Sequence, residues 1–241
     1  MSIQTRNTQT AAPSATLLAF PRPRAHIGAA LKRHRLPEAL AAALARESEG
    51  FAEVSAHAAL AYALDQRIKA APLDLERAQG ILLSGPAGAG KSTVAAKIMH
   101  AATLVGRKAS LARADSALAL FRAAANPPDV LMVMEADGFN PLNARAASAF
   151  SALGQAPGVE SVGVISALSD AEDVADLVGA FHFKRVIVTN MDRTRRLGAF
   201  VAATTAGAAL AHISASPHPE DALETLAPGA VATLLLDSPI H

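Results

Sequence analysis

Residues 85–92 have the sequence GPAGAGKS, which is a complete G-x-x-x-x-G-K-S phosphate-binding motif. An apolar run at residues 80–84 precedes the motif and predicts a buried strand, and residues 93–99 follow it with the composition of a helix. A strand, a glycine-rich loop and a helix in this order are the context that the motif requires. Glycines let the backbone turn its N–H groups toward phosphate oxygens, and the helix N-terminus adds its own N–H groups. The stretch therefore predicts a P-loop protein in which Lys91 reaches the β- and γ-phosphates and Ser92 ligates Mg²⁺.

From residue 80 onward, short apolar runs alternate with amphipathic stretches. This alternation predicts an α/β fold, a P-loop NTPase with a mostly parallel sheet flanked by helices. The expected strands are residues 81–84, 109–113, 130–134, 160–166, 185–189 and 209–213. The expected helices are residues 91–104, 115–124, 142–153, 170–180, 194–206 and 220–226. A last apolar run with Val231, Leu234 and Leu235 fits either a helix or a strand.

The chain divides into three segments by composition. Residues 1–24 are polar and contain prolines, so we expect a disordered tail. Residues 25–78 are the expected helical N-terminal domain, because leucines such as Leu36 and Leu40 recur there with helical spacing. Residues 79–241 are the expected P-loop domain. The predicted architecture is thus a P-loop domain preceded by a small helical bundle.

The overall composition excludes several classes of function. Hydrophobic residues make up 51% of the 241 residues and charged residues 18%, and the formal net charge is +1. A charge this small provides no general attraction to nucleic acid. Because the chain has no cysteine, disulfides, cysteine-bound zinc and thiol nucleophiles are excluded. No apolar run approaches the roughly 18 residues of a membrane span, and the first residues lack a secretory signal, so we expect a cytoplasmic protein without a transmembrane segment.

A second motif follows the strand expected at residues 185–189, where Thr189 to Asp192 has the pattern T-N-x-D. Loops at the carboxyl ends of parallel strands line the ligand crevice of open α/β sheets. The N1–H and the exocyclic amine of guanine can both donate to one carboxylate, whereas N1 of adenine is an acceptor that a carboxylate repels. Asp192 is therefore a candidate for recognising guanine. The alternative is that Asp192 caps the helix expected at residues 194–206.

Two more carboxylates and a glycine follow the strand expected at residues 130–134, in the sequence Glu135-Ala136-Asp137-Gly138. A carboxylate at this place could hold Mg²⁺ through water, and Gly138 could bring a backbone N–H beside the γ-phosphate. Asp115 follows the neighbouring strand and has two interpretations: it orients the attacking water, or it caps the next helix.

Taken together, these motifs resemble the signal-recognition-particle (SRP) group of GTPases, and within it the flagellar FlhF branch. Residues 85–97, GPAGAGKSTVAAK, resemble the family's GPTGVGKTTTxAK. Residues 106–115 resemble its GkkVaLitaDT, and residues 135–138 stand where the family has D-T-A-G. Residues 189–192 stand at its T-K-L-D, and residues 219–223 resemble its late V-P-E-D-L. The order and spacing of these pieces make the likeness more specific than any one motif.

The resemblance implies a GTP-binding protein that hydrolyses GTP slowly and acts as a switch, with GTP/GDP and Mg²⁺ as ligands. It implies a protein partner, either another GTPase or a regulator, and no nucleic acid. It also implies peripheral contact with the inner membrane or the cell pole, in flagellar placement or protein targeting. Two other hypotheses remain open: a scaffold that holds nucleotide without turnover, and a P-loop ATPase.

The sequence departs from the family pattern near the transferred phosphate. Glu135 stands in place of the family's aspartate, Ala136 in place of its threonine and Phe139 in place of its arginine. Asn190 replaces the lysine that lies over the guanine ring, and Leu118 replaces a second arginine. These differences favour retained nucleotide binding with weak hydrolysis.

The candidate site residues have three expected roles. The catalytic candidates are Asp115, Asp137 and Gly138. The nucleotide-binding candidates are Gly85, Pro86, Ala87, Gly88, Ala89, Gly90, Lys91, Ser92, Thr93, Thr189, Asn190 and Asp192. The candidate ligands of Mg²⁺ are Ser92 and Glu135.

Overall fold

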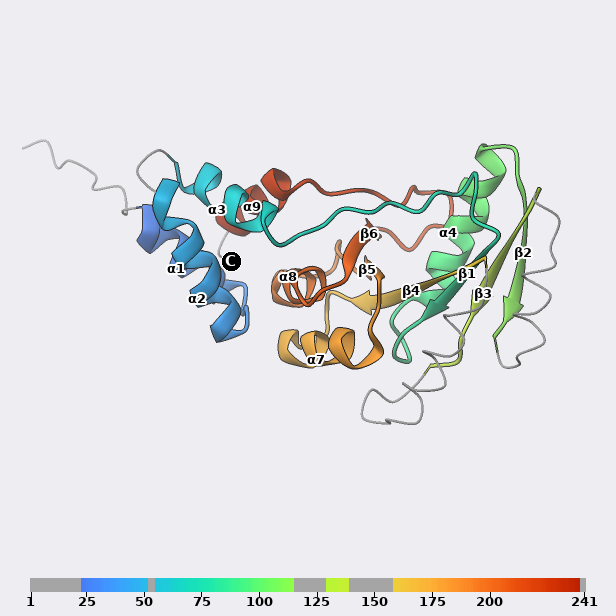
Figure 1. Cartoon of the computed structure of the whole chain (residues 1–241), viewed down its shortest axis with the longest axis horizontal. Helices are drawn as coiled ribbons and strands as arrows, with labels where there is room; N and C mark the ends of the chain where they lie inside the picture. The colour runs from blue at the N-terminus through green and yellow to red at the C-terminus, as the bar shows by residue number, and fades with distance from the viewer. Residues whose placement is uncertain (1–22, 52–54, 115–128, 139–157, 239–241) are drawn as a thin grey trace, which may run out of the picture.

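The computed structural model describes residues 23–51, 55–114, 129–138 and 158–238. Within these ranges six strands form one sheet in the order β2-β3-β1-β4-β5-β6, and every neighbouring pair is parallel (Figure 1). The strands are β1 (Gly80–Ser84), β2 (Lys108–Arg113), β3 (Val130–Glu135), β4 (Val159–Ser166), β5 (Arg185–Thr189) and β6 (Ala209–Ile213). All six lie within one residue of the expected strands, so the predicted parallel α/β sheet is confirmed.

Helices cover both faces of the sheet. Every residue of the central strand β1 is buried, as expected for a strand with both faces covered. Ile81 and Leu83 pack with the apolar face of α4 (Lys91–Leu104), whereas Leu82 belongs to the core on the other face. That second face is covered by α7 (Ala171–Phe181) and α8 (Gly198–Thr205).

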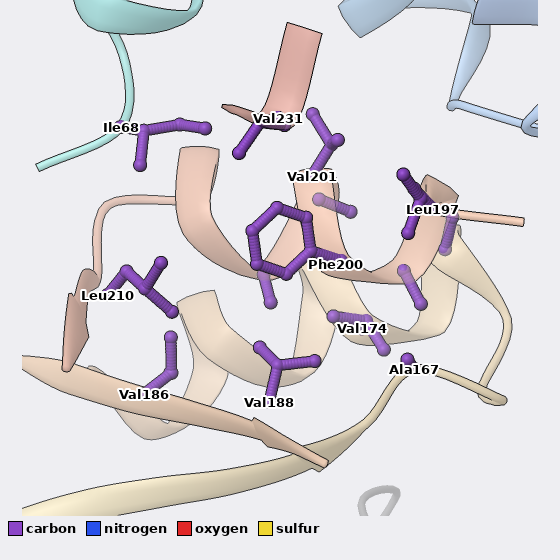
Figure 2. Packing of buried hydrophobic residues seen from close by; sticks show 14 of the residues in the cluster. Ile68, Ala167, Val174, Val186, Val188, Leu197, Phe200, Val201, Leu210 and Val231 are labelled. Carbon is purple, nitrogen blue, oxygen red and sulfur yellow. The ribbon is translucent and has the colours of Figure 1, made fainter. Parts of the chain in front are cut away.

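Phe200 of α8 is the centre of the core on the α8 side of the sheet. Figure 2 shows its ring above Val186 and Val188 of β5, with Ile68 and Val231 on the far side of α8. Its side chain is fully buried. Replacing such a phenylalanine by alanine costs about 3–5 kcal/mol, so this residue is a major support of the junction between sheet and helices.

Four helices form a bundle at one end of the molecule. Three come from the N-terminal part, α1 (Pro23–Arg33), α2 (Glu38–Glu47) and α3 (Ala56–Asp65), with a short 3₁₀ turn at Glu49–Phe51. The fourth is α9 (Pro228–Asp237), which packs mainly on α3 (Figure 1). Arg33 of α1 donates to the carbonyls of Leu235 and Leu236 at 2.7 and 3.2 Å, and so satisfies acceptors at the end of α9.

Several of the expected helices differ from the structure or lie outside the described residues. The helix expected at residues 220–226 is wrong, because Glu224 and Ile213 exchange two backbone hydrogen bonds as an antiparallel bridge. The helix expected at residues 194–206 begins only at Gly198, and the apolar run at Val231 is helical. The helices expected at 115–124 and 142–153, and most of the tail expected at residues 1–24, lie outside the described residues. No helix in the described ranges has the length and apolar character needed to span a membrane.

Candidate functional site

The phosphate-binding motif forms the loop between β1 and α4, at the carboxyl edge of the sheet. Gly85 lies so close to β4 that an added Cβ would stand 2.1 Å from the carbonyl oxygen of Val164. Gly88 and Gly90 have φ values of 76° and 91°, in the left-handed region that favours glycine. Gly90 is the residue directly before α4, so the loop turns straight into the helix N-terminus. This is the local geometry that a phosphate-binding loop needs.

Lys91 is the first residue of α4 and its side chain folds back over the loop. Its Nζ donates to the carbonyl oxygens of Gly85 and Pro86, each at 3.0 Å. The residue is only 6% exposed, and burial lowers the pKa of its amine, while the charges of Glu135 and Asp137 oppose that shift. The structure therefore holds a largely buried ammonium group against the loop.

Ser92 and Glu135 meet at the mouth of the loop. Ser92 Oγ donates to Glu135 Oε1 at 2.7 Å, because Glu135 ends β3 beside Leu83 of β1. A hydroxyl and a carboxylate are hard oxygen ligands of the kind Mg²⁺ prefers. Within the described ranges no group of three or more histidine, aspartate or glutamate residues suited to a metal is found. Such a pair suits Mg²⁺, which commonly takes one or two carboxylates and completes its shell with water and phosphate.

Gly138 lies directly against the phosphate loop. A Cβ at this position would stand 2.8 Å from Cα and 2.9 Å from Cβ of Ala87, which is closer than real side chains come. Any larger residue at position 138 would have to displace one of the two loops. Gly138 therefore lies beside the phosphate loop, and the contact of its N–H with a γ-phosphate stays a prediction.

Arg113 is a site residue that our sequence analysis did not assign. It ends β2 as the register partner of Glu135, and it forms an ion pair with Asp137. Both side chains are well exposed, at 72% and 65%. The available signal was an arginine at the carboxyl end of β2, the strand that pairs with β3, whereas the predicted roles at these two strand ends were given only to carboxylates and Gly138. Asp115, two residues further on, lies outside the described residues.

On the opposite side, the loop after β5 is bonded to the phosphate loop. Thr189 Oγ1 donates to the carbonyl of Ala89 at 2.7 Å, and the Thr189 residue is 4% exposed. Gly90 also lies close to this threonine, since an added Cβ would stand 3.3 Å from Thr189 Cγ2. Asn190 has a φ of 57°, and its amide donates to Ser166 Oγ at 3.0 Å. These bonds fix the T-N-x-D loop against the phosphate loop and the last residue of β4.

Asp192 is exposed, and its carboxylate has no hydrogen-bond or ion-pair partner among the described residues. Because α8 begins at Gly198, Asp192 does not cap that helix, and that alternative is wrong. The remaining nucleotide-binding candidates form the tip and the end of the motif: Ala87 and Gly88 are exposed, and Thr93 lies in the first turn of α4.

The T-N-x-D loop is also tied to the helical bundle, through His34. The N–H of Leu197 donates to His34 Nδ1 at 3.1 Å, so the proton of the neutral ring lies on Nε2, which donates to the carbonyl of Leu235 at 3.0 Å. Burial lowers the pKa of His34, and neighbouring Arg33 lowers it further, against the opposing effect of the bond to Leu235. A neutral histidine thus bridges α1, the loop before α8, and α9.

No protein-family model and no curated protein sequence matches the chain. Solved structures do resemble it. The structure of FlhF in complex with GTP and Mg²⁺ has a TM-score of 0.70 at 17% identity, over 90% of this chain and 100% of that one. The structure of FtsY from Mycoplasma mycoides has a TM-score of 0.66 at 16% identity, over 89% of this chain and 88% of that one. The signal recognition particle 54 kDa protein from Aeropyrum pernix K1, in complex with GDP, has a TM-score of 0.64 at 20% identity, over 87% and 62%. The chain therefore has the fold of SRP-type GTPases, which confirms the fold and the resemblance expected from its motifs.

Proposed function

We propose that this chain, with its SRP-type GTPase fold, binds GTP together with Mg²⁺ and acts as a slow GTPase switch. One observation carries the proposal: the 2.7 Å hydrogen bond from Thr189 to Ala89 joins the T-N-x-D loop to the phosphate loop. A single nucleotide could then be held by its phosphates at one loop and by its base at the other. The FlhF structures with GTP or GMPPNP and Mg²⁺ support the same ligands for this fold.

Guanine recognition would depend on Asp192. A carboxylate with no protein partner among the described residues is available to accept the N1–H and the exocyclic amine of a guanine base. Adenine has no donor at N1, so the same carboxylate would disfavour ATP. Asn190, held in its left-handed conformation by the bond to Ser166, would lie where the family's lysine covers the base.

Ser92 and Glu135 would hold the Mg²⁺ ion, directly or through water. When bound, the ion would neutralise part of the phosphate charge. Lys91 would exchange its two carbonyl contacts for phosphate oxygens, which are stronger acceptors for an ammonium group.

Hydrolysis would be slow, because the described residues around the phosphate loop offer few free cations. Arg113 at the end of β2 is one candidate, and its exposed pair with Asp137 is worth only about 0–1 kcal/mol. Arg113 could therefore exchange the carboxylate of Asp137 for a phosphate oxygen at little cost in free energy. In other nucleotide switches the γ-phosphate orders nearby loops. Here the corresponding segments would be those that contain Asp115 and Gly138, and Gly138 lies against Ala87 of the phosphate loop.

The proposed switch would also have a cellular location, a partner and a process in which it acts. We infer a cytoplasmic protein that works with a protein partner, another GTPase or a regulator, and contacts the inner membrane or the cell pole peripherally. Flagellar placement or protein targeting is the process that the fold relationship suggests. The second candidate function is a nucleotide-bound scaffold without turnover, favoured by Leu118 and Phe139, which stand where the family has arginines.

The test is a titration of the purified protein with GTP, GDP and ATP, with and without Mg²⁺, followed by a turnover assay. We expect tighter binding of the guanine nucleotides and hydrolysis far below the roughly 1–10³ s⁻¹ of ordinary enzymes. Equal affinity for ATP and GTP would contradict the GTPase proposal and favour a P-loop ATPase. Tight GTP binding with no turnover, even with cell extract added, would instead favour the scaffold.

A further inference from the structure

A second pocket, separate from the phosphate loop, lies where the turn between α1 and α2 meets the loops after β4 and β5. Its volume is about 470 Å³. Thr194 Oγ1 donates to the carbonyl of Ala167 at 3.3 Å, and the Leu197 N–H donates to His34, so the three walls are bonded together. The backbone of the turn also packs so tightly on Gly198 that an added Cβ would stand 2.4 Å from a carbonyl oxygen. The pocket is therefore built into the fold.

Four arginines line this pocket: Arg35, Arg193, Arg195 and Arg196. All four are exposed, and the ion pairs found among the described residues include none of them. Asp170 also lines the pocket, but its Oδ1 accepts the N–H of the residue two positions on, at 2.9 Å, as the N-cap of α7. The pocket thus carries a surplus of positive charge in a chain whose net charge is only +1.

The backbone of Arg35 gives a second, independent sign of a functional site. Its φ of 54° lies in the left-handed region, which long side chains seldom adopt. The turn at this position therefore uses an arginine where a glycine or asparagine would be less strained. Strain of this kind is concentrated at ligand-binding and switch segments.

We propose that this pocket binds a small phosphate-bearing molecule. Guanidinium groups donate pairs of hydrogen bonds that match the oxygens of a phosphate. The pocket volume lies in the range of about 300–1,000 Å³ that is typical of small-molecule sites. Leu168, 52% exposed in the wall, adds an apolar surface on which the rest of such a molecule can pack.

The charge of the pocket is not matched by the parts of the chain outside the described ranges. Of those residues only Glu53 and Asp115 have acidic side chains, and the same segments contain arginines of their own. No run of carboxylates is available there to neutralise four guanidinium groups. An acidic segment of this chain is therefore not the expected occupant of the pocket.

The test uses pyrophosphate as the probe and removes the competing phosphate loop. Calorimetric titration at constant ionic strength compares Lys91→Ala with the triple variant Lys91→Ala, Arg195→Ala, Arg196→Ala. The matched control adds Arg77→Ala and Lys108→Ala instead, since this also removes two exposed cations and neither residue lines the pocket. The same arginine pair is also replaced in the chain with Lys91 intact, and thermal melting of every variant checks the fold.

We expect saturable binding of one pyrophosphate in the Lys91→Ala and control proteins, weakened at least about tenfold by loss of the two pocket arginines. Citrate, a tricarboxylate, should bind more weakly than pyrophosphate. The proposal is overturned if the arginine pair has no effect, or if the Lys91→Ala protein shows no saturable binding. It is also overturned if a glutamate-rich peptide binds more tightly than pyrophosphate, since the pocket would then be a docking site for an acidic protein segment. None of these outcomes depends on nucleotide binding at the phosphate loop.

Discussion

On the side of the phosphate loop that faces β5, the contacts are buried hydrogen bonds, whereas on the side that faces β2 and β3 they are exposed. Thr189, 4% exposed, bonds to Ala89 of the loop. Arg113 and Asp137, 72% and 65% exposed, pair with one another instead. Loss of a buried hydrogen-bond partner costs about 1–3 kcal/mol, while an exposed ion pair contributes about 0–1 kcal/mol.

This difference between the two sides of the phosphate loop predicts different behaviour in nucleotide binding and in turnover. The side expected to hold the base is structurally fixed before any ligand arrives, and it keeps the T-N-x-D pattern. The side expected to act on the transferred phosphate is held by weak, exchangeable contacts, and it contains the substitutions Glu135 and Ala136. A protein built in this way should bind nucleotide well and hydrolyse it slowly. The predictions that follow test this division.

Lys91→Ala should have the largest effect, because Lys91 is the buried cation that the phosphate loop itself carries. Two charge-assisted contacts to phosphate are worth about 1.5–3 kcal/mol each, so GTP affinity should fall at least about 100-fold. The fold should remain, since Lys91 bonds only to two loop carbonyls within the described residues. Fluorescence titration and thermal melting measure the two quantities. Lys108→Ala, at an exposed position at the start of β2, is the matched control, and unchanged GTP affinity in Lys91→Ala would contradict the phosphate-loop interpretation.

Asp192→Asn should remove the discrimination between bases that the β5 side provides. A site that hydrogen-bonds a substrate N–H rejects analogues without it, so the preference for GTP over ATP should fall by roughly 10–100-fold. The free carboxylate of Asp176 on the surface of α7 offers a control, Asp176→Asn. Competition titrations of both nucleotides give the ratio directly. A ratio that stays the same in Asp192→Asn would remove this residue from base recognition.

Arg113→Ala should affect turnover and leave binding nearly unchanged, in contrast to the first two variants. An arginine supplied to the transferring phosphate is worth up to about 10³–10⁵ in rate, and an exposed one should contribute less, roughly 10–100-fold in kcat. GTP affinity should stay within about threefold. Single-turnover hydrolysis and equilibrium titration separate the two quantities, with Arg77→Ala as control. An unchanged kcat would show that Arg113 only pairs with Asp137.

His34 should give the smallest effect, seen in stability as a function of pH. Its pKa in the folded protein is lowered from 6.5, so the unfolded chain binds the proton more readily. The free energy of unfolding should therefore be greatest above pH 6.5 and decrease as the pH falls toward the lowered folded pKa. Denaturant unfolding between pH 8 and 5 should show a weaker pH dependence in His34→Asn than in the parent chain or in His182→Asn, an exposed control. Parallel curves for all three proteins would contradict the neutral bridge.

The strands could be predicted well because most are short apolar runs, and a polar residue ends or directly follows each run. Patterns that depend on distant contacts could not be read in this way. Residues 220–226 have helical composition, but Glu224 pairs with Ile213. Residues 194–197 were expected to be helical, but Thr194 bonds to Ala167 and Leu197 to His34, both far away in sequence.

The candidate site shows the same contrast between local patterns, which the sequence reveals, and distant contacts, which it does not. The roles of the phosphate loop residues follow from a local motif, and the structure gives that motif the expected loop and helix. The pairing of Arg113 with Asp137 depends on the strand order β2-β3-β1, which no single stretch of sequence contains. The assigned roles of these residues stay predictions until the variants are measured.

The position of α9 in the helical bundle has a consequence for how the protein is made. The buried face of α3, which includes Ala59, Leu60 and Ala63, packs on a helix that the ribosome releases after all six strands. Contacts between such distant segments form late, because long loops must close first. During synthesis the first three helices therefore keep an apolar face uncovered until α9 emerges, and this nascent bundle is the part of the chain that most needs protection from aggregation.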